Sequence, residues 1–483
     1  MQTIFALSTP PGKSGIAVIR ISGVAAKEAL HALCVTPLPA PRVATLATLY
    51  EPDDTGQFLP LLGGGQVGVG HTHHLGGQPH PKPPLKGEGK EKADHIGAVI
   101  DKALILWFPA PHSFTGEDVV ELHIHGSRAV LRQLLAVFSA LPSLRAALPG
   151  EFTHRAFLNG KMDLTAAEGL ADLIDAETEA QKKQALRHMQ GEAAGFYAKL
   201  RAGILHALAF LEAYIDFPDE DIPQSVNEEI NKEIQNITSL LEHQLADKGT
   251  AERTRDGIAV AILGPPNVGK SSLMNLLAGR DVAIVSQFAG TTRDVIEVHL
   301  DIGGYCVILS DTAGIREHAG EIEEEGIRRS FEQARQADIR IVVIDKHTMA
   351  AEELKKLVNA DTILLLNKSD LALPSPLPAV SGITAIPVSV KKREGIDALM
   401  RALEERIASL QGAESSFITR SRHRRHLALA LGHLRHYTAQ SHAGIELRCE
   451  ELRRAATEIG KITGSIAVDE LLGHIFASFC IGK

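Results

Sequence analysis

One short stretch constrains the fold of this chain more than any other: an apolar run that leads directly into a glycine-rich loop. IAVAIL (258–263) is followed by GPPNVGKSS (264–272), which fits the pattern G-x-x-x-x-G-K-[ST] between a predicted strand and a predicted helix. In this pattern backbone N–H groups surround phosphates, Lys270 reaches the β- and γ-phosphate oxygens, and the Ser271 hydroxyl suits Mg²⁺. The alternative is a chance glycine-rich turn, which the strand–loop–helix context disfavours. A parallel α/β domain that binds a nucleoside triphosphate is therefore predicted.

Three further motifs each follow an apolar run and indicate that the nucleotide is GTP. DTAG (311–314) ends the run YCVILS, which places Asp311 to act on Mg²⁺ through water and the Gly314 N–H to sense the γ-phosphate. NKSD (367–370) follows TILLL, and the Asp370 carboxylate can accept the N1 and N2 hydrogens of guanine, a pair that adenine does not offer. SVK (389–391) follows TAIPV at the loop expected to contact the base.

A polar segment before the DTAG motif completes the predicted site. In AGTTRD (289–294), Thr292 can complete the coordination of Mg²⁺ and close over the γ-phosphate, the alternative being an ordinary polar turn. The residues that these motifs predict to contact GTP are Asn267, Val268, Gly269, Lys270, Ser271, Ser272, Ala289, Gly290, Thr291, Thr292, Asp311, Thr312, Ala313, Gly314, Asn367, Lys368, Asp370, Ser389, Val390 and Lys391, and the resemblance described below adds Ser286, Gln287 and Phe288.

Length and composition limit the classes of protein that remain. A chain of 483 residues exceeds what one hydrophobic core usually organises, so about two to four domains are expected. No apolar run approaches the roughly 20 residues of a membrane span, and we expect a cytoplasmic protein with no membrane partner. Four dispersed cysteines without a CxxC pair disfavour a disulfide framework and a zinc knuckle. A net charge of −9 disfavours non-specific nucleic-acid binding over the whole surface.

The pattern along the chain predicts a multidomain protein of α/β and α classes. Residues 1–160 mix short β-rich runs with a probable helix and form a predicted small α/β domain, interrupted at 63–95 by a Gly-, His- and Pro-rich insertion. Residues 161–250 read as helices, 251–411 as the nucleotide domain and 412–483 as helices again. The simplest architecture is a Ras-like P-loop domain inserted into a helical domain.

Two polar segments leave alternatives open. His71, His73, His74 and His80 lie in the insertion, where an exposed loop is favoured over a metal site because no Cys or carboxylate partners occur at ordered spacing. The basic run RSRHRRH (420–426) begins the last helical block, where it either contacts phosphate or forms a solvated helix start.

The motifs together resemble one family. GPPNVGKSS, AGTTRD, DTAGIR, NKSD and the terminal FCIGK are similar to those of the MnmE (TrmE) family of tRNA-modification GTPases, and the similarity covers nearly the whole chain. The GTPase motifs are shared with other translation-related GTPases. The more specific ones are CIGK at the chain end, RAFLNGKMDL and SFTGEDVVEL.

The resemblance answers a question that DTAGIR (311–316) raises, because Ile315 stands where small GTPases carry the glutamine that orients the attacking water. The family binds K⁺ beside the β- and γ-phosphates, where the ion stabilises developing charge. The matching K⁺ ligands are Asn267, Ser286, Phe288 through its carbonyl, and Thr291, with Mg²⁺ on Ser271 and Thr292. Among Glu321, Glu323, Glu324 and Glu325, only the resemblance singles out Glu323 as the water-positioning acid. Lys270 and Glu323 are thus the predicted catalytic residues for hydrolysis.

The resemblance also implies a one-carbon site in the N-terminal domain, which is similar to a tetrahydrofolate-binding fold. The matching residues are Arg20, Glu121, Lys161 and the C-terminal Lys483, which without the resemblance would be ordinary surface charges. A carboxylate suits the amide-type donors of a pterin, and cations suit a glutamyl tail. Cys480 is a candidate nucleophile or redox group, the alternative being a small residue that packs the tail.

In function, the resemblance implies a K⁺-dependent GTP hydrolase. With an FAD-dependent partner of the MnmG (GidA) type, it would convert C5 of the wobble uridine of certain tRNAs to a carboxymethylaminomethyl or aminomethyl form. The one-carbon donor would be a 5-formyl or 5,10-methylene tetrahydrofolate derivative. The chain would form a homodimer through its N-terminal domain and a heterotetramer with the partner. Alternatives are a GTP-dependent ribosome-assembly factor, disfavoured because no GxxG clamp follows the GTPase segment, and a thiol or metal protein, disfavoured by the dispersed cysteines.

Overall fold

The computed structural model describes most of the chain as two compact units. The described residues are 1–33, 37–52, 97–216, 224–247, 249–280, 282–284, 297–311, 335–346, 358–371, 374, 376–410, 416–439, 444–466, 469–477 and 479–482. The first unit comprises Met1–Met162 and Val468–Lys483, and the second Asp163–Ala467. None of the helices in the described ranges is both long and apolar enough for a membrane crossing.

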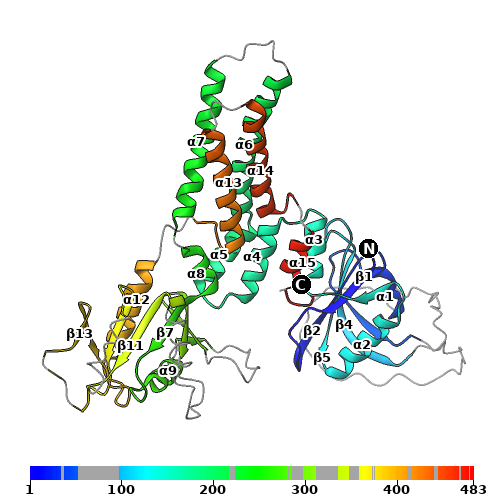
Figure 1. The fold of residues 1–483 in the computed structure, drawn as a ribbon. Helices are drawn as coiled ribbons and strands as arrows, with labels where there is room; N and C mark the ends of the chain where they lie inside the picture. Colours follow the sequence, from blue (N-terminus) through cyan, green and yellow to red (C-terminus); the bar gives the residue numbers. More distant parts are fainter. Residues whose placement is uncertain are drawn as a thin grey trace, which may run out of the picture. The chain divides into compact units, whose positions relative to one another are not determined.

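The first unit is built on a six-stranded sheet (Figure 1). The strand order is β3-β4-β5-β2-β1-β6, in which β1–β6 is the parallel pair and the other neighbours are antiparallel. The side chains of Phe5 and Ile19 pack with Phe138 of the covering helix α2, whose first turn is capped by Ser127 accepting from the Ala129 N–H. Its elements are β1 (Thr3–Leu7), β2 (Ser14–Ser22), α1 (Ala26–Ala32), β3 (Thr45–Tyr50), β4 (Val99–Phe108), β5 (Val119–Gly126), α2 (Arg128–Ala140), β6 (Leu144–Ala146), α3 (Glu151–Leu158) and α15 (Asp469–Ala477).

The C-terminal segment of the chain packs on this first unit. Phe476 of α15 stacks against His154 of α3 at a ring-centroid distance of 4.7 Å and contacts the ring of Phe157 at 6.2 Å. The sequence pattern placed residues 412–483 together as the second part of the helical domain, whereas the structure groups Val468–Lys483 with the N-terminal sheet. Both termini of the chain therefore belong to one unit (Figure 1).

The second unit contains a helical part assembled from two separate stretches of sequence. The helices predicted for these stretches are confirmed, and they bury apolar faces: Ile204, Leu208 and Leu211 on α6 and Ile230 and Ile234 on α7 share one core with Leu427 and Leu431. The helices are α4 (Leu164–Asp175), α5 (Glu179–Met189), α6 (Glu192–Asp216), α7 (Gln224–Ala246), α8 (Thr250–Asp256), α13 (Ser421–Ala439) and α14 (Ile445–Thr463). Helices α13 and α14 lie beside α6 and α7 (Figure 1).

Between these stretches the chain forms a seven-stranded sheet of the predicted parallel α/β class. The order is β15-β12-β11-β7-β10-β9-β8; the strands from β15 to β10 are parallel, and β9 is antiparallel to both β10 and β8. The expected fold class, a nucleotide-binding α/β domain inserted into a helical domain, is confirmed. The elements are β7 (Ile258–Leu263), α9 (Lys270–Ala278), β8 (Ala283–Ile284), β9 (Glu297–Ile302), β10 (Tyr305–Asp311), β11 (Ile339–Ile344), β12 (Thr362–Leu366), β13 (Ala379–Val380), β14 (Ile383–Thr384), β15 (Ile386–Pro387) and α12 (Ile396–Leu410).

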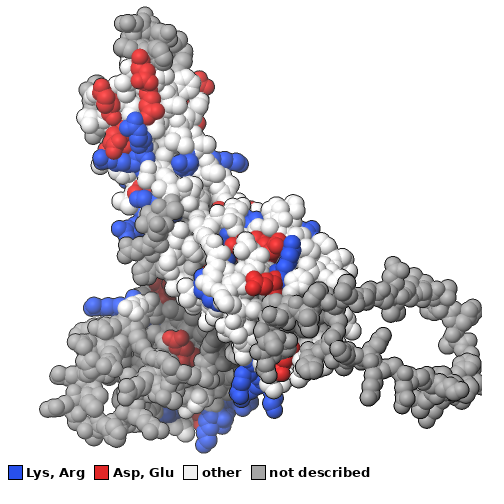
Figure 2. Space-filling model, turned by 90° about the vertical axis from the view of Figure 1, so that its right-hand side faces the viewer, with Lys and Arg blue, Asp and Glu red and all other residues white. Residues whose placement is uncertain are grey.

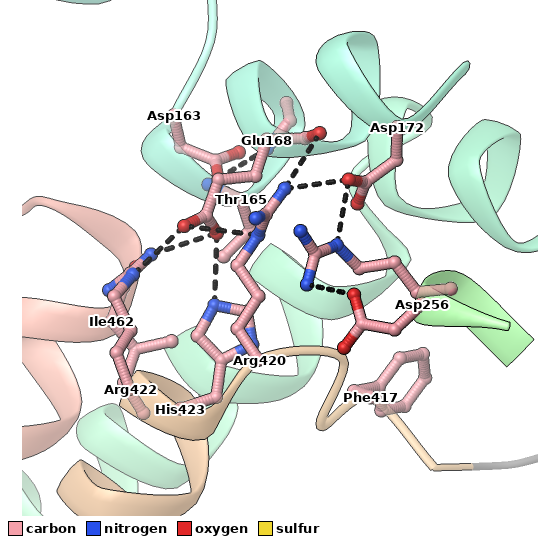
Figure 3. Close-up of polar contacts among 12 residues, drawn as sticks. Asp163, Thr165, Glu168, Asp172, Asp256, Phe417, Arg420, Arg422, His423 and Ile462 are labelled. Atoms are coloured by element: carbon pink, nitrogen blue, oxygen red, sulfur yellow. Dashed lines mark hydrogen bonds and ion pairs between the residues drawn. The ribbon is translucent and has the colours of Figure 1, made fainter. Parts of the chain in front are cut away.

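A buried ionic network joins the two helical stretches (Figure 3). Glu168 of α4 is 1% exposed. Its Oε1 and Oε2 accept hydrogen bonds of 2.9 Å from Nε and Nη2 of Arg422, and Oε2 also lies 2.9 Å from Nε2 of His423. Burial alone would raise the pKa of Glu168, but His423 and Arg422 outweigh it and hold that pKa well below its usual range. Removing one partner of such a buried pair typically costs about 3–5 kcal/mol, so the network fixes α4 against α13.

The same network reaches the first strand of the nucleotide domain. Asp172 of α4 accepts hydrogen bonds from Arg420 Nη2 at 2.7 Å and from Arg255 Nε at 3.0 Å, and Arg255 lies three residues before β7 (Figure 3). The Asp172 carboxylate thus binds the chain just before the inserted domain, at Arg255, and again after it, at Arg420 beside the start of α13.

A buried histidine beside the network makes the stability of this helical part depend on pH. His188 of α5 is 3% exposed, and burial, helped by nearby positive groups, lowers its pKa from 6.5 to about 4. Between these values the unfolded chain binds a proton that the folded chain excludes, so stability falls as the pH drops from 6.5 toward 4, by about 1.4 kcal/mol per pH unit. Burial likewise lowers the pKa of His423, which adds to the same loss.

We therefore expect His188→Gln to reduce the slope of unfolding free energy against pH by about 1.4 kcal/mol per unit between pH 6.5 and 5. Denaturant unfolding should be followed by the circular dichroism of the helices, because the one tryptophan, Trp107, lies on β4 in the other unit. If the unfolding free energy of the parent and of His188→Gln fell with the same slope between pH 6.5 and 5, His188 would not be the source of the pH dependence.

Candidate functional site

The predicted nucleotide-binding segments meet at one edge of the seven-stranded sheet. Strands β10, β7, β11, β12 and β15 run in the same direction, so their carboxyl ends share that edge. Asp311 ends β10 opposite Ile262 of β7, and Gly264 follows β7 directly. The Asn367 N–H donates to the carbonyl of Ile344 at 2.8 Å, which places the start of NKSD beside the end of β11.

The loop between β7 and α9 has the conformation that its glycines permit. Gly264 and Gly269 adopt positive φ angles of 142° and 101°, and a Cβ atom at either position would collide, with the Val343 carbonyl oxygen and the Asn367 amide respectively. Asn267 also has a positive φ, 62°, and is exposed. Lys270 is 8% exposed, and its ammonium donates to the carbonyls of Gly264 and Pro265, both at 2.9 Å. The lysine that the sequence predicts to bind phosphate is therefore held against the carbonyls of this loop.

Asp370 is positioned for recognition of a guanine base. The hydroxyl of Ser389, which lies after β15, donates to Asp370 Oδ1 at 2.7 Å, and this hydrogen bond is the main cause that lowers the pKa of the carboxyl. The Ser389 hydroxyl also accepts from the Lys392 N–H at 3.2 Å. A carboxylate fixed in its ionised form accepts two hydrogen bonds side by side, as N1–H and the N2 amino group of guanine require.

Two side chains of NKSD tie the base-binding loop to the phosphate-binding loop. The Asn367 side-chain amide donates to the Val268 carbonyl at 2.7 Å, and its oxygen accepts from the Val390 N–H at 3.2 Å. The Lys368 ammonium, on a residue with φ 63°, donates to the Asn267 carbonyl at 2.9 Å. Base and phosphate recognition are thus mechanically linked through these two residues.

Sequence reasoning missed Asp345. This residue follows β11 directly, is 6% exposed, and its Oδ2 accepts from the Lys368 ammonium at 2.9 Å. A signal was present, because Asp345 ends the apolar run IRIVVI as the other motifs end theirs. It holds Lys368 between the two loops.

Several predicted residues lie outside the described part of the chain. Of the predicted ligands of K⁺, Asn267 is described, while Ser286, Phe288 and Thr291 fall outside it. The other predicted residues that fall outside the described ranges are Gln287, Ala289, Gly290, Thr292, Thr312, Ala313, Gly314, Glu323 and Lys483.

The first unit brings together two of the residues predicted to bind folate. Arg20 of β2 and Glu121 of β5 are cross-strand partners, and Arg20 donates to Glu121 Oε1 through Nε at 3.0 Å and Nη2 at 2.8 Å. The Arg20 guanidinium also lies over the rings of Phe114 and Phe152, 5.4 and 5.9 Å from their centroids. The Arg20 and Glu121 side chains are 20% and 18% exposed. They form a partly accessible ion pair on aromatic rings.

A buried arginine supports this region. Arg155 of α3 is 2% exposed and donates to both oxygens of Glu117, to Glu151 and to the Gln2 carbonyl. Lys161 donates to the Pro111 carbonyl at 3.0 Å, so it contacts the 109–118 loop from which Glu117 comes. The sequence did not single out Arg155, since one arginine in RAFLNGKMDL gives no sign of its burial.

The C-terminal tail hydrogen-bonds to Gly150, just before α3, and to Ser8, just after β1. The Cys480 carbonyl accepts from the Gly150 N–H at 3.3 Å, and the Gly482 carbonyl accepts from the Ser8 hydroxyl at 3.0 Å. Ser8 follows β1, on which Ala6 pairs with Arg20. The exposed Cys480 thus belongs to the same unit as the Arg20–Glu121 pair.

For the basic run at the start of α13 the sequence left two alternatives, phosphate contact or a solvated helix start. Three of its four arginines do neither, because they pair with carboxylates of this chain. Arg420 and Arg422 bind Asp172 and Glu168, and Arg424 binds Glu252 at 2.7 Å. Arg425 is exposed. On the face drawn in Figure 2, Lys and Arg side chains of the upper helical part lie among Asp and Glu side chains. The run therefore serves chiefly as an internal clamp.

Two family models match consecutive parts of the chain, and the boundary between them lies close to the boundary between the two units at Met162 and Asp163. The family model "MnmE helical domain" matches residues 164–480, and "GTP-binding protein TrmE N-terminus" matches residues 3–61 and 73–161. The chain is similar to the tRNA modification GTPase MnmE of Parvibaculum lavamentivorans, 47% identical over 486 residues, and to that of Paramagnetospirillum magneticum, 44% identical over 489 residues. Both alignments cover 100% of this chain and of the relative.

The comparison with solved structures gives matches of low TM-score. The G domain of the T. maritima FeoB iron transporter is 25% identical and covers 32% of this chain and 98% of its own, with a TM-score of 0.23. The assignment therefore rests on the sequence matches. Since one family model spans residues 164–480 and full-length relatives are 44 and 47% identical, the chain belongs to the MnmE family.

Proposed function

We propose that this protein is a GTP hydrolase that acts in tRNA modification. The observation that carries the hydrolase is the linked pair of loops, in which Asn367 and Lys368 fasten the guanine-reading segment to the phosphate-binding loop. The tRNA substrate follows from the family, whose curated members are named tRNA modification GTPases. Mixing GTP with the purified full-length chain and measuring released phosphate tests the first part. Assaying the modified wobble uridine of tRNA from a deletion strain tests the second.

The residues of this chain divide the work of hydrolysis. Lys270 leaves its two loop carbonyls to neutralise phosphate oxygens, while the N–H groups at the start of α9 donate to the phosphates. Ser271, the second residue of α9, supplies a hydroxyl for Mg²⁺, an ion that prefers oxygen ligands. Asp370 selects guanine.

Potassium is the proposed activator. The Asn267 side-chain amide fits such an ion, because its oxygen is a hard neutral donor on an exposed residue whose own carbonyl is held by Lys368. The further ligands proposed from the family are Ser286, Phe288 and Thr291. A cation bound there supplies positive charge beside the β- and γ-phosphates, as an arginine finger does in other GTPases.

Replacing Na⁺ by K⁺ at equal ionic strength should raise the hydrolysis rate of the parent, and Asn267→Ala should abolish most of that rise, roughly 10²-fold, while GTP still binds. Rates should be measured with saturating GTP, and affinity by nucleotide titration. Asn275→Ala, an exposed asparagine on α9, is the matched control and should keep the K⁺ effect. Equal rates in the two salts for the parent would refute the K⁺ proposal.

Glu323 is the proposed water-positioning residue. DTAGIR itself offers none, because Ile315 stands where small GTPases carry a glutamine. Glu323→Ala should slow single-turnover hydrolysis by about 10²- to 10⁴-fold without weakening GTP binding, since the acid acts on the attacking water. Glu324→Ala, one residue along, should hydrolyse at the parental rate. A parental rate for Glu323→Ala, or an equal loss in Glu324→Ala, would show that Glu323 has no special role.

A tetrahydrofolate derivative is the proposed source of the one-carbon unit. The residues fit a pterin: Glu121 Oε1 is held by Arg20, while Glu121 Oε2 lies 3.6 Å from His123 Nε2, a buried atom without a hydrogen-bond partner in the described structure. A polar ligand at this place would give both atoms partners. Lys161 and Lys483 are proposed for the glutamyl tail, and the carrier would supply the carbon at the formyl or methylene oxidation level.

We expect Glu121→Gln to weaken binding of 5-formyl-tetrahydrofolate about tenfold, because a charge-assisted hydrogen bond is replaced by a neutral one. Titration calorimetry of the full-length chain measures this. Asp101→Asn is the control, since Asp101 pairs with His125 on neighbouring strands and is not among the proposed ligands. Unchanged affinity in Glu121→Gln would remove Glu121 from the folate site.

The remaining parts of the proposed function concern partners. An FAD-dependent protein of the MnmG type would join a homodimer of this chain in a heterotetramer, supply redox chemistry and act with it on C5 of the wobble uridine. Cys480 is proposed to act near the one-carbon unit because its tail hydrogen-bonds to Gly150 and to Ser8, which follows β1. The alternative, a ribosome-assembly factor, would co-sediment with a ribosomal subunit in a GTP-dependent way.

A further inference from the structure

Three ligand-type side chains from distant parts of the sequence converge in the second unit. Glu177 lies between α4 and α5, His299 on β9 and Cys306 on β10. Glu177 Oε2 is 2.6 Å from His299 Nδ1 and 3.6 Å from Cys306 Sγ, and the three ligand atoms all lie within 4.8 Å of one another. Cys306 is buried, while the side chains of Glu177 and His299 are about a quarter exposed, at 25% and 24%.

The backbone of each of these residues is held by contacts that do not involve the three ligand-type side chains themselves. The N–H groups of Glu177 and Thr178 both donate to Gln181 Oε1, within a capping box that starts α5. His299 pairs with Ile308 on antiparallel strands, so Cys306, two residues from Ile308, lies on the same face of the hairpin. The Ala180 N–H donates to the Gly304 carbonyl at 3.2 Å, which fastens α5 to the hairpin turn. Such support is what preorganised metal sites require.

We propose that Glu177, His299 and Cys306 form a binding site for a thiophilic divalent cation of the Zn²⁺ class, which would join the β9–β10 hairpin to the α4–α5 turn. The inference is independent of the proposed function, since none of the three residues belongs to the nucleotide or folate sites. One carboxylate, one imidazole and one thiolate with an open fourth position is a ligand set typical of zinc.

The separations agree with such an ion. Tetrahedral zinc with oxygen and sulfur ligands places the two ligand atoms about 3.5 Å apart, close to the 3.6 Å between Glu177 and Cys306. The Glu177–His299 hydrogen bond must open by less than about 1 Å to reach its tetrahedral separation. On binding, the Cys306 S–H bond breaks, its proton goes to solvent and the sulfur electron pair goes to the metal, with no change of oxidation state.

Without a metal the thiol is inert. Burial first, and then the neighbouring Glu177 carboxylate, raise the pKa of Cys306 to about 12, so the group is no nucleophile at neutral pH. The competing explanation of the cluster is a purely hydrogen-bonded contact, in which His299 and Cys306 bind Glu177 directly. The two explanations differ in whether the thiolate ligates an added metal.

Cobalt(II) is the appropriate probe, because it takes zinc positions and gives a thiolate-to-metal charge-transfer band. Adding Co²⁺ to the full-length, chelator-treated protein should give this band, saturating at one equivalent, and added Zn²⁺ should remove it. Cys306→Ser should abolish the band, and His299→Gln should weaken Co²⁺ affinity at least about tenfold, since even outer-shell changes cost about 10–100-fold.

The controls separate this site from others that bind metals. Cys449→Ser and Cys480→Ser should keep the band, because those thiols lie on α14 and in the C-terminal tail. Co²⁺ at the Mg²⁺ position, or at the cluster of His433, His436 and Glu451, lacks a thiolate and gives no such band. Absence of the band at saturating Co²⁺, or its survival in Cys306→Ser, would overturn the proposal and leave the hydrogen-bonded contact. If Cys306→Ser fails to fold, the affinity loss in His299→Gln decides instead.

Discussion

The position of β7 between two parallel neighbours is the constraint on which the nucleotide site depends. Because β10 and β11 both hydrogen-bond to β7 in parallel, the segments after β7, β10 and β11 leave the sheet at one edge. The next strand, β12, adds Asn367 and Lys368 to the same edge. Residues that follow β7, β11 and β12 then meet at this edge, where Lys368 contacts both Asn267 and Asp345.

The insertion of this domain into the helical part is held by charge as well as by apolar packing. Asp172 binds Arg255 where the chain enters the nucleotide domain and Arg420 where α13 begins after it. Glu168 on the same helix fixes Arg422 and His423. Both carboxylates lie on α4, so one helix holds both ends of the insertion. The cluster of Glu177, His299 and Cys306 adds a contact to the hairpin β9–β10, which connects the AGTTRD segment to DTAG in sequence. The hairpin between these two motifs is therefore in direct contact with the helical part.

The first unit shows how a polar site is built on an antiparallel sheet. Arg20 and Glu121 face each other across β2 and β5, and the aromatic rings of Phe114 and Phe152 lie against the guanidinium. Arg155 is 2% exposed, and carboxylates of Glu117 and Glu151 and the Gln2 carbonyl accept its hydrogen bonds. The C-terminal tail adds its hydrogen bonds at the end of β1. The proposed one-carbon site therefore rests on the Arg20–Glu121 pair of this sheet and on the C-terminal tail that hydrogen-bonds to Ser8.

The sequence by itself determined the elements and the motifs, because both depend on local patterns. Ile204 and Ile230 lie on helices with a 3.6-residue apolar period and are buried, the apolar run IAVAIL forms β7, and NKSD directly follows the strand formed by TILLL. Pairings between residues distant in sequence could not be read in this way. Which surfaces pack together decides the Lys368–Asp345 contact, the burial of Arg155 and the use of RSRHRRH as an internal clamp. Charge patterns in the sequence do not distinguish a paired arginine from a solvated one. Only the tertiary structure moved the last residues of the chain to the N-terminal sheet, since a helical period fixes which face is apolar but not which neighbour covers it.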